Sequence, residues 1–72
     1  MEIKQKIGQR IKELRGKVGI SQMELANLSE LDRTYITSVE NGKRNISIVN
    51  IERIAKALNI TLKEFFDDAE FD

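Results

Sequence analysis

The stretch from Gln22 to Arg44 reads QMELANLSELDRTYITSVENGKR and contains the clearest helix signals of the chain. Ser21 is a favourable N-cap just before it, and Glu24 stands where a capping box requires an acidic side chain, so a short helix is expected to begin here. Asp32 is the next N-cap and predicts a second helix from Arg33 to about Glu40. The stretch therefore predicts two short helices joined by a tight turn.

The small residue Ala26 is placed where these two helices would cross, and a larger side chain there would push them apart. Two short helices joined by a turn of about three or four residues are typical of a helix-turn-helix. On this pattern alone, DNA binding and a plain helical bundle remain equally open. The residues expected to face inward are Leu25, Ala26, Leu28, Leu31, Ile36 and Val39.

Three further helices are expected around this pair, which makes the chain an all-α, five-helix domain. Asn41 and Gly42 break the helix before a basic loop, because both residue types tolerate the positive φ of a helix end. Ser47 caps the fourth helix, and Thr61, with Glu64 in a second capping box, opens the fifth. The apolar stripes are Ile3, Ile7, Ile11, Leu14 and Val18 before Gly19, then Ile48, Ile51, Ile54, Ala55 and Leu58, then Leu62, Phe65 and Phe66.

Composition excludes several classes of site. The 72 residues allow one small domain, and the absence of cysteine and histidine excludes disulfides, thiolate zinc sites and histidine-based catalysis. We expect no cofactor and no enzymatic activity, because the one acidic cluster lies in residues 67–72, read as a frayed, solubilising tail. No apolar run is long enough for a membrane span or a signal peptide, so a soluble, cytoplasmic protein is expected.

Charge is balanced overall but unevenly distributed. The chain has 12 basic and 12 acidic residues, and taken alone this neutrality argues against nucleic-acid binding. Residues 1–17 carry a net charge of +4, whereas residues 63–72 carry −4. The asymmetry predicts a basic portion that faces a polyanion and an acidic end directed away from it.

The residues Gln22-Met-Glu-Leu25-Ala26 and the string LDRTYITSVENGKR from Leu31 to Arg44 resemble the lambda-repressor-like (Cro/XRE-type) helix-turn-helix family. The resemblance runs from about Ile7 to Phe66, within a predicted domain of residues 1–66, and is greatest to restriction-modification controller proteins. Where the family usually has glycine in the turn, this chain has Glu30, at a cost of about 1 kcal/mol.

The resemblance implies that the second helix of the pair enters the DNA major groove. Arg33 suits a bidentate contact to guanine, while Tyr35 either packs its ring between helices or reaches a phosphate. The phosphate contacts are expected from Gln22 and from the basic loop, with Arg15 and Lys17 as weaker candidates. The implied DNA-binding set is Gln22, Arg33, Thr34, Tyr35, Thr37, Ser38, Lys43, Arg44 and Asn45.

The apolar side chains of the fifth helix exceed what one short helix on a small monomer needs. They are expected to form part of a two-fold dimer interface, with burial of Phe65 in its own core as the alternative. The expected interface residues are Ile60, Leu62, Phe65 and Phe66.

The family implies a dimeric regulator of palindromic operators that activates and represses its own promoter, with RNA polymerase as a partner when it activates. A protein-interaction module, such as an antitoxin or adaptor, is the alternative. The polar face from Arg33 to Ser38 and the basic loop favour DNA, since a protein-binding face is expected to be more apolar.

Overall fold

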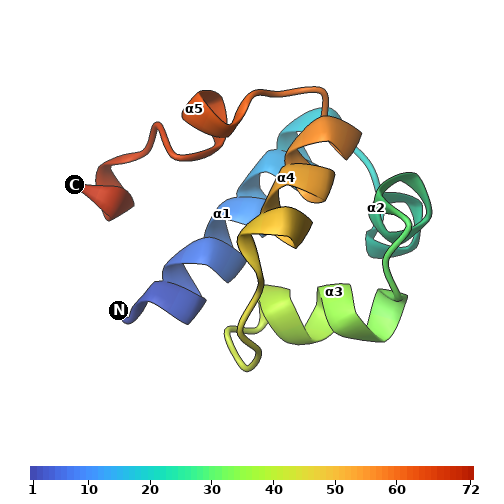
Figure 1. The fold of residues 1–72 in the computed structure, drawn as a ribbon, viewed down its shortest axis with the longest axis horizontal. Coiled ribbons are helices and arrows are strands. Elements are labelled where there is room, and N and C mark those ends of the chain that lie inside the picture. Colours follow the sequence, from blue (N-terminus) through green and yellow to red (C-terminus); the bar gives the residue numbers. More distant parts are fainter.

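The computed structural model describes all 72 residues and consists only of helices and connecting loops (Figure 1). The five predicted helices are confirmed, and one additional 3-10 turn, η1, follows them. None of these helices combines the length and apolarity that crossing a bilayer requires. The elements are α1 (Ile3–Val18), α2 (Gln22–Ser29), α3 (Arg33–Glu40), α4 (Ile48–Ala57), α5 (Leu62–Phe65) and η1 (Ala69–Phe71).

The predicted capping side chains of Ser21, Ser47 and Thr61 begin their helices, whereas Asp32 precedes α3 without a side-chain capping bond. The Ser21 hydroxyl accepts from the Glu24 backbone N–H at 3.0 Å while the Glu24 carboxylate accepts from the Ser21 N–H, also at 3.0 Å. Thr61 and Glu64 form the same reciprocal pair at the start of α5. The hydrogen bonds from the Thr61 backbone N–H and, secondly, its hydroxyl lower the pKa of Glu64 below its ordinary value.

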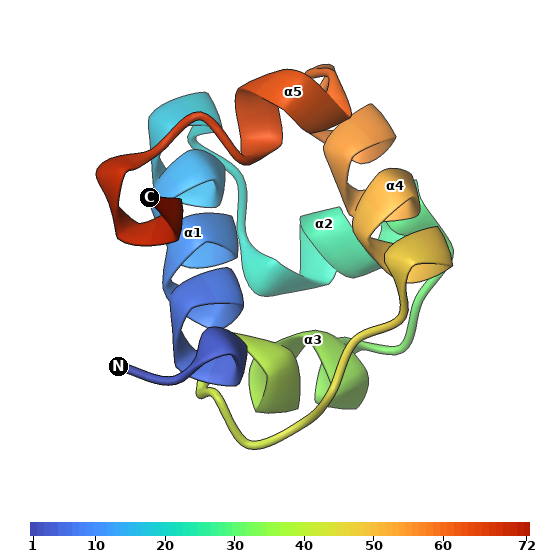
Figure 2. The ribbon, with the colours of Figure 1, turned by 60° about the vertical axis from the view of Figure 1, so that its left-hand side comes forward.

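The helices enclose one core (Figures 1 and 2). Helix α3 packs against α1 and α2, α2 also packs against α4, and α4 carries α5. The chain end after α5 returns along α1, so both termini lie beside that helix. The core residues are Ile7, Ile11, Leu14, Leu25, Ala26, Ile36, Val39, Ile51, Ile54, Leu58 and Phe65.

The backbones of α1 and α3 meet at Gly8. A Cβ atom on Gly8 would lie 2.8 Å from the carbonyl oxygen of Glu40 and closer still to that of Val39. Because these are backbone atoms of a packed helix, they cannot move aside without displacing α3. Gly8 is therefore a requirement for the position of α3, which its sequence pattern did not indicate.

The turn between α2 and α3 has the left-handed residue that the family resemblance implied. Glu30 has φ 58° and ψ 37°, and the Leu31 N–H bonds the Ala26 carbonyl at 2.9 Å. Since a side chain disfavours this region by about 1 kcal/mol or more, Glu30 adopts it at a cost that glycine would avoid.

Four residues of the predicted inward-facing set and apolar stripes are exposed: Ile3 by 61%, Val18 by 51%, Leu28 by 60% and Ile48 by 62%. Ile3 and Val18 are the first and last residues of α1. The packed side of α2 is formed by Leu25, Ala26 and Ser29, whose hydroxyl donates to the Leu25 carbonyl at 2.6 Å, and Leu28 points away from it. Ile48 is the first residue of α4 and lies beyond the part of that helix that its neighbours cover.

The predicted frayed tail is wrong for part of residues 67–72. Asp68 is half-buried and its carboxylate is 3.2 Å from Arg10 Nη1, while its other oxygen caps η1 through the Glu70 N–H. Phe71 meets the ring of Phe66 edge to face at 5.2 Å. The acidic composition of the segment suggested disorder. The sequence pattern did not reveal the contacts that order it, because these are made with Arg10 on α1 and Phe66 after α5.

Two glycines of α1 provide a matched test of the α1–α3 contact. We expect Gly8→Ala to lower the free energy of unfolding by about 2 kcal/mol or more, because the new methyl group meets α3 backbone. Gly16→Ala, with nothing within 4 Å of the new Cβ, should raise it by about 0.5–1 kcal/mol. Urea unfolding followed by circular dichroism measures both, and equal effects would contradict the close approach.

Candidate nucleic-acid interface

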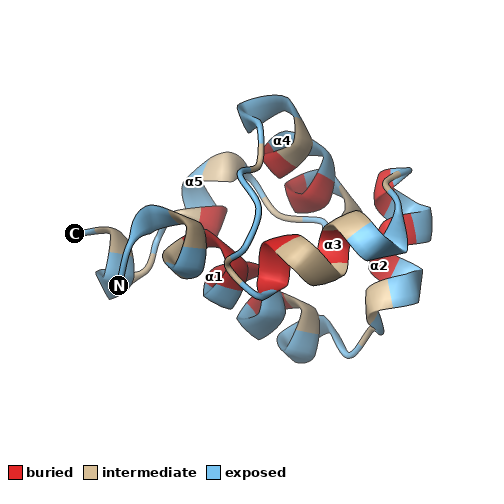
Figure 3. Cartoon of the chain, turned by 90° about the horizontal axis from the view of Figure 1, so that it is seen from below, coloured by how far each residue is buried: buried red, intermediate tan, exposed pale blue.

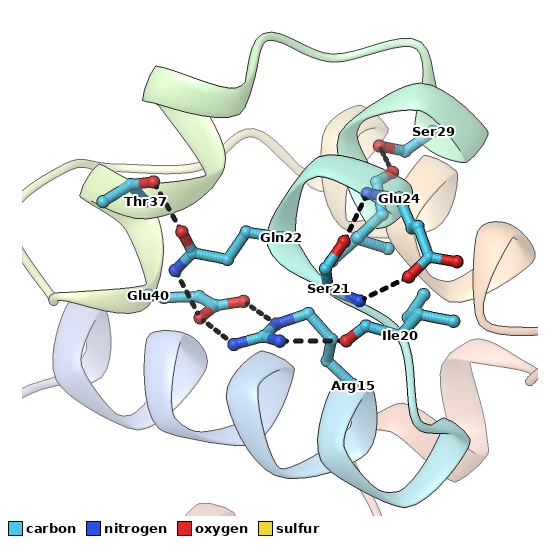
Figure 4. A network of polar contacts seen from close by, with 9 residues as sticks. Arg15, Ile20, Ser21, Gln22, Glu24, Ser29, Thr37 and Glu40 are labelled. Carbon is cyan, nitrogen blue, oxygen red and sulfur yellow. Dashed lines mark hydrogen bonds and ion pairs between the residues drawn. The ribbon is translucent and has the colours of Figure 1, made fainter.

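A buried carboxylate connects the three helices of this region (Figure 4). The side chain of Glu40, at the end of α3, is only 1% exposed. It accepts from Arg15 Nε at 2.8 Å and Nη2 at 3.1 Å, and from Gln22 Nε2 at 3.1 Å. Arg15 lies in the last turn of α1 and Gln22 begins α2. One carboxylate therefore ties α3 to both neighbouring helices.

The same network orients two of the predicted DNA-binding residues. The Thr37 hydroxyl donates to Gln22 Oε1 at 2.9 Å, so the two side chains point toward each other across the α2–α3 pair (Figure 4). Gln22 is half-buried, and its amide keeps one N–H for an outside acceptor. This geometry agrees with a glutamine presented in a fixed orientation at the edge of α3.

One side of α3 forms an open polar groove of about 400 Å³ without a hydrophobic lining residue. The start of α3 is exposed, whereas Ile36, Val39 and Glu40 are buried. Figure 3 shows α3 with exposed, half-buried and buried stretches. Asn41 was not predicted, although it follows Arg33 and Thr37 at intervals of four and could have been found by that spacing. The groove is lined by Arg33, Thr34, Thr37, Ser38, Asn41 and Lys43.

Tyr35 lies outside this groove. It is half-buried, its hydroxyl accepts from Asn50 Nδ2 at 3.0 Å, and the guanidinium of Arg44 stacks over its ring at 4.9 Å from the centroid. The ring thus connects α3 to α4 and orients Arg44, which is exposed. The hydroxyl retains its own hydrogen, so packing and a contact to an outside oxygen are compatible.

The basic loop between α3 and α4 has two sides. Lys43 lines the polar groove, and Arg44 stacks on Tyr35. Asn45 instead lines an apolar groove of about 240 Å³ beside the start of α1, with Ile46 and Phe66 among its neighbours. Asn45 is therefore not among the residues that line the α3 groove.

Two of the basic residues counted in residues 1–17 form hydrogen bonds and ion pairs with other parts of the protein. Arg15 is bonded to Glu40 and to the Ile20 carbonyl, and the hydrogen bond to Glu40 raises its pKa further. Arg10 is 8% exposed and is bonded to the end of α5. The weak expectation that Arg15 contacts phosphate is thus not supported, and the basic segment offers less free charge than its composition indicates.

The prediction that Phe65 lies in the dimer interface disagrees with the structure. It is 0% exposed in the isolated chain and belongs to the core, because the single turn of α5 directs it between the other helices. Ile60, Leu62 and Phe66 are half-buried and pack against the core from outside. Phe65 is unavailable to a second molecule.

An exposed apolar surface lies at the start of α4 instead. Ile48 and Val49 are 62% and 58% exposed. With Glu52 and Leu62 they line a shallow depression of about 140 Å³ where α4 meets α5. We call Ile48, Val49 and Leu62 the α4–α5 apolar patch.

No three His, Cys, Asp or Glu side chains are grouped as a metal ion would require. Every buried side-chain nitrogen or oxygen has a hydrogen-bond partner.

Comparisons with known proteins agree with this geometry. The helix-turn-helix family HTH_3 matches residues 11–65. The control protein C.MunI of Mycoplasma sp. is 50% identical over 70 residues, which are 96% of this chain and 95% of that protein. The control protein C.BamHI of Bacillus amyloliquefaciens is 44% identical over 61 residues, 83% of this chain and 75% of the relative.

The chain belongs to the Cro/XRE-type helix-turn-helix family. The predicted resemblance to restriction-modification controller proteins is confirmed.

Solved structures share the fold of this helix-turn-helix protein. The restriction-modification controller protein C.AhdI from Aeromonas hydrophila superimposes with a TM-score of 0.84 at 52% identity, covering 88% of this chain and 96% of that one. C.Esp1396I gives 0.88 at 37% identity, covering 93% and 88%. The latter structure is a tetramer of C.Esp1396I in complex with its natural 35 base-pair operator. The five-helix, lambda-repressor-like architecture is thereby confirmed.

The Glu40 network yields a test based on stability. Arg15→Met should lower the free energy of unfolding by about 3 kcal/mol, because it leaves a buried carboxylate without its cation. The double variant Arg15→Met/Glu40→Leu should recover a large part of that loss, since no charge is then buried. Urea unfolding measures both, and a double variant no more stable than the single one would contradict the assignment.

Proposed function

We propose that this protein is a restriction-modification controller, a sequence-specific regulator that binds palindromic operator DNA as a homodimer. The α3 groove carries this proposal. Its lining is polar along two turns of a helix, it includes the cations of Arg33 and Lys43, and no apolar residue interrupts it. A helix with this face suits the major groove of B-DNA, whose base edges present hydrogen-bond donors and acceptors.

We infer different roles for these side chains from their positions. Arg33, at the exposed start of α3, is placed to read a guanine, and Thr34, Thr37, Ser38 and Asn41 follow it along the helix. Gln22, Lys43 and Arg44 flank α3 and are placed to hold phosphates on either side. Asn45 and Tyr35 belong to the flank rather than to the base-reading set.

A two-fold dimer would bring two copies of α3 to successive major grooves, about 34 Å apart. The α4–α5 apolar patch is the surface we propose for it, because Ile48 and Val49 are exposed aliphatic residues in a small protein. By analogy with controller proteins, the dimer activates and represses its own promoter. It contacts RNA polymerase when it activates, and it acts in the cytoplasm without catalysing a reaction.

The protein-interaction alternative is less well supported by the groove. A partner helix would need apolar residues to bury, whereas the α3 groove has none. Salt separates the two functions, since operator affinity should fall steeply with the logarithm of salt concentration as phosphates are neutralised.

Replacing Arg33 and replacing Lys43 should have different effects on DNA binding. Arg33→Ala should cost about 1–3 kcal/mol of discrimination at one base pair of each half-site and leave the other positions unchanged. Lys43→Ala should weaken binding to all sequences alike and reduce the salt slope by about 1. An operator is first selected from a random duplex pool. Fluorescence anisotropy with single-base variants of that operator then measures both effects.

Lys56→Ala is the matched control, because Lys56 is an exposed lysine in the last turn of α4 and does not line the α3 groove. It should bind like the unchanged protein. If all three variants behaved alike, or if affinity were independent of salt, the proposed DNA interface would be excluded.

The dimer surface has its own test. Val49→Glu should convert the protein to a monomer at micromolar concentration, because it places a charge in the apolar patch, and should leave the fold intact since Val49 is 58% exposed. Leu28→Glu introduces the same charge at a 60% exposed leucine of α2 and should leave the dimer unchanged. Sedimentation equilibrium distinguishes the outcomes, and a Val49→Glu protein that still dimerises would contradict the patch.

A further inference from the structure

Arg10 occupies an unusual position for an arginine in the middle of a surface helix. Only 8% of it is exposed, and its guanidinium points at the end of α5 instead of into solvent. Its hydrogen bonds reach the carbonyls of Phe65 (2.7 Å), Glu64 (2.9 Å) and Asp67 (3.4 Å) and the carboxylates of Asp68 (3.2 Å) and Glu13 (3.3 Å).

These contacts supply what α5 lacks. The helix has four residues, too few to be stable alone, and carbonyls at its C-terminal end have no partners within the helix. Arg10 satisfies the carbonyls of Glu64 and Phe65 with a cation, which also suits the negative end of the helix. A lysine could keep the charge but could not form the planar fork that reaches several oxygens at once.

The position of α5 determines what the protein presents to a second copy. Phe65 is buried beneath the helix, while Leu62 lines the same shallow depression as Ile48 and Val49. The ring of Phe66 contacts the ring of Phe65 edge to face, with 4.9 Å between the centroids, so its position also depends on that of α5. Any rotation of α5 about Phe65 would move Leu62 relative to the first turn of α4.

We propose that Arg10 is a positioning residue for dimerisation, which by clamping the end of α5 to α1 sets the shape of the α4–α5 apolar patch. Through that patch it sets the separation of the two α3 helices. This inference rests on the proposed dimer. It assigns a function to a basic residue that charge counting had placed on a DNA-facing surface.

The experiment compares Arg10→Lys, which keeps the charge and loses the fork, with Lys12→Gln, which removes a charge from an exposed position of the same helix. Sedimentation equilibrium, at a temperature where circular dichroism shows each variant folded, gives the dimer dissociation constant. Arg10→Lys should raise that constant about tenfold or more, since charge-assisted hydrogen bonds to α5 are lost, whereas Lys12→Gln should leave it unchanged.

A second readout distinguishes positioning from stability alone. Operators selected by the unchanged protein are resynthesised with one base pair added or removed between the half-sites. The unchanged protein should bind only the original spacing tightly, and Arg10→Lys should discriminate less between spacings. A folded Arg10→Lys protein with the dimer constant and spacing preference of the unchanged protein would overturn the proposal.

Asp68→Asn covers the case in which Arg10→Lys fails to fold. It removes one charged partner of Arg10 and leaves the carbonyl contacts, so it should weaken dimerisation about threefold in the same direction. An unchanged dimer constant in Asp68→Asn would then overturn the inference. If the unchanged protein were itself monomeric, the proposed dimer would have failed, which is a different result.

Discussion

The Glu40 carboxylate is the constraint on which the position of α3 depends. It lies at the end of the helix that carries the polar groove, where solvent does not reach it, so both of its oxygens must be satisfied by the protein. Arg15 and Gln22 do this from the ends of two other helices. Gly8 allows the backbones of α1 and α3 to approach closely enough for the arrangement to form. The α3 groove is therefore held in position by one ion pair, one amide and a glycine without a side chain.

The pairing of arginines with acidic side chains of the protein means that the charge counts of the sequence do not give the exposed positive charge. The excess of positive charge in residues 1–17 includes Arg10 and Arg15, which neutralise Asp68 and Glu40 within the fold. Arg33, Lys43 and Arg44 are exposed on α3 and the loop after it, and the other exposed basic residues are spread over α1, α4 and α5. In the proposed DNA interface, the three exposed cations beside the α3 groove would give modest non-specific attraction, and selectivity would then depend more on the polar residues between Arg33 and Asn41.

Local chemistry made most of the fold predictable. Ser21, Ser47 and Thr61 begin helices because their side chains bond nearby backbone groups, and such signals are complete within four residues of sequence. Burial was less predictable, since Ile48 continues an apolar stripe that its neighbours do not cover, and Phe65 is directed inward by a helix of one turn. The roles of Gly8, Arg10 and Arg15 depend on residues 25 or more positions away, which no local pattern contains.

Helix α1 connects these separate features. Arg15 and Gly8 fix α3, and Arg10, between them in sequence, fixes α5. Arg10 and Arg15 are five residues apart, which is about 7.5 Å along the helix axis and a large rotation around it, so they reach elements on different sides of α1. The positions of α3, which carries the polar groove, and of the proposed dimer surface thus both depend on contacts with α1. In a dimer, the separation of the two α3 helices would then depend on α1 even though α1 contributes no residue to the polar groove.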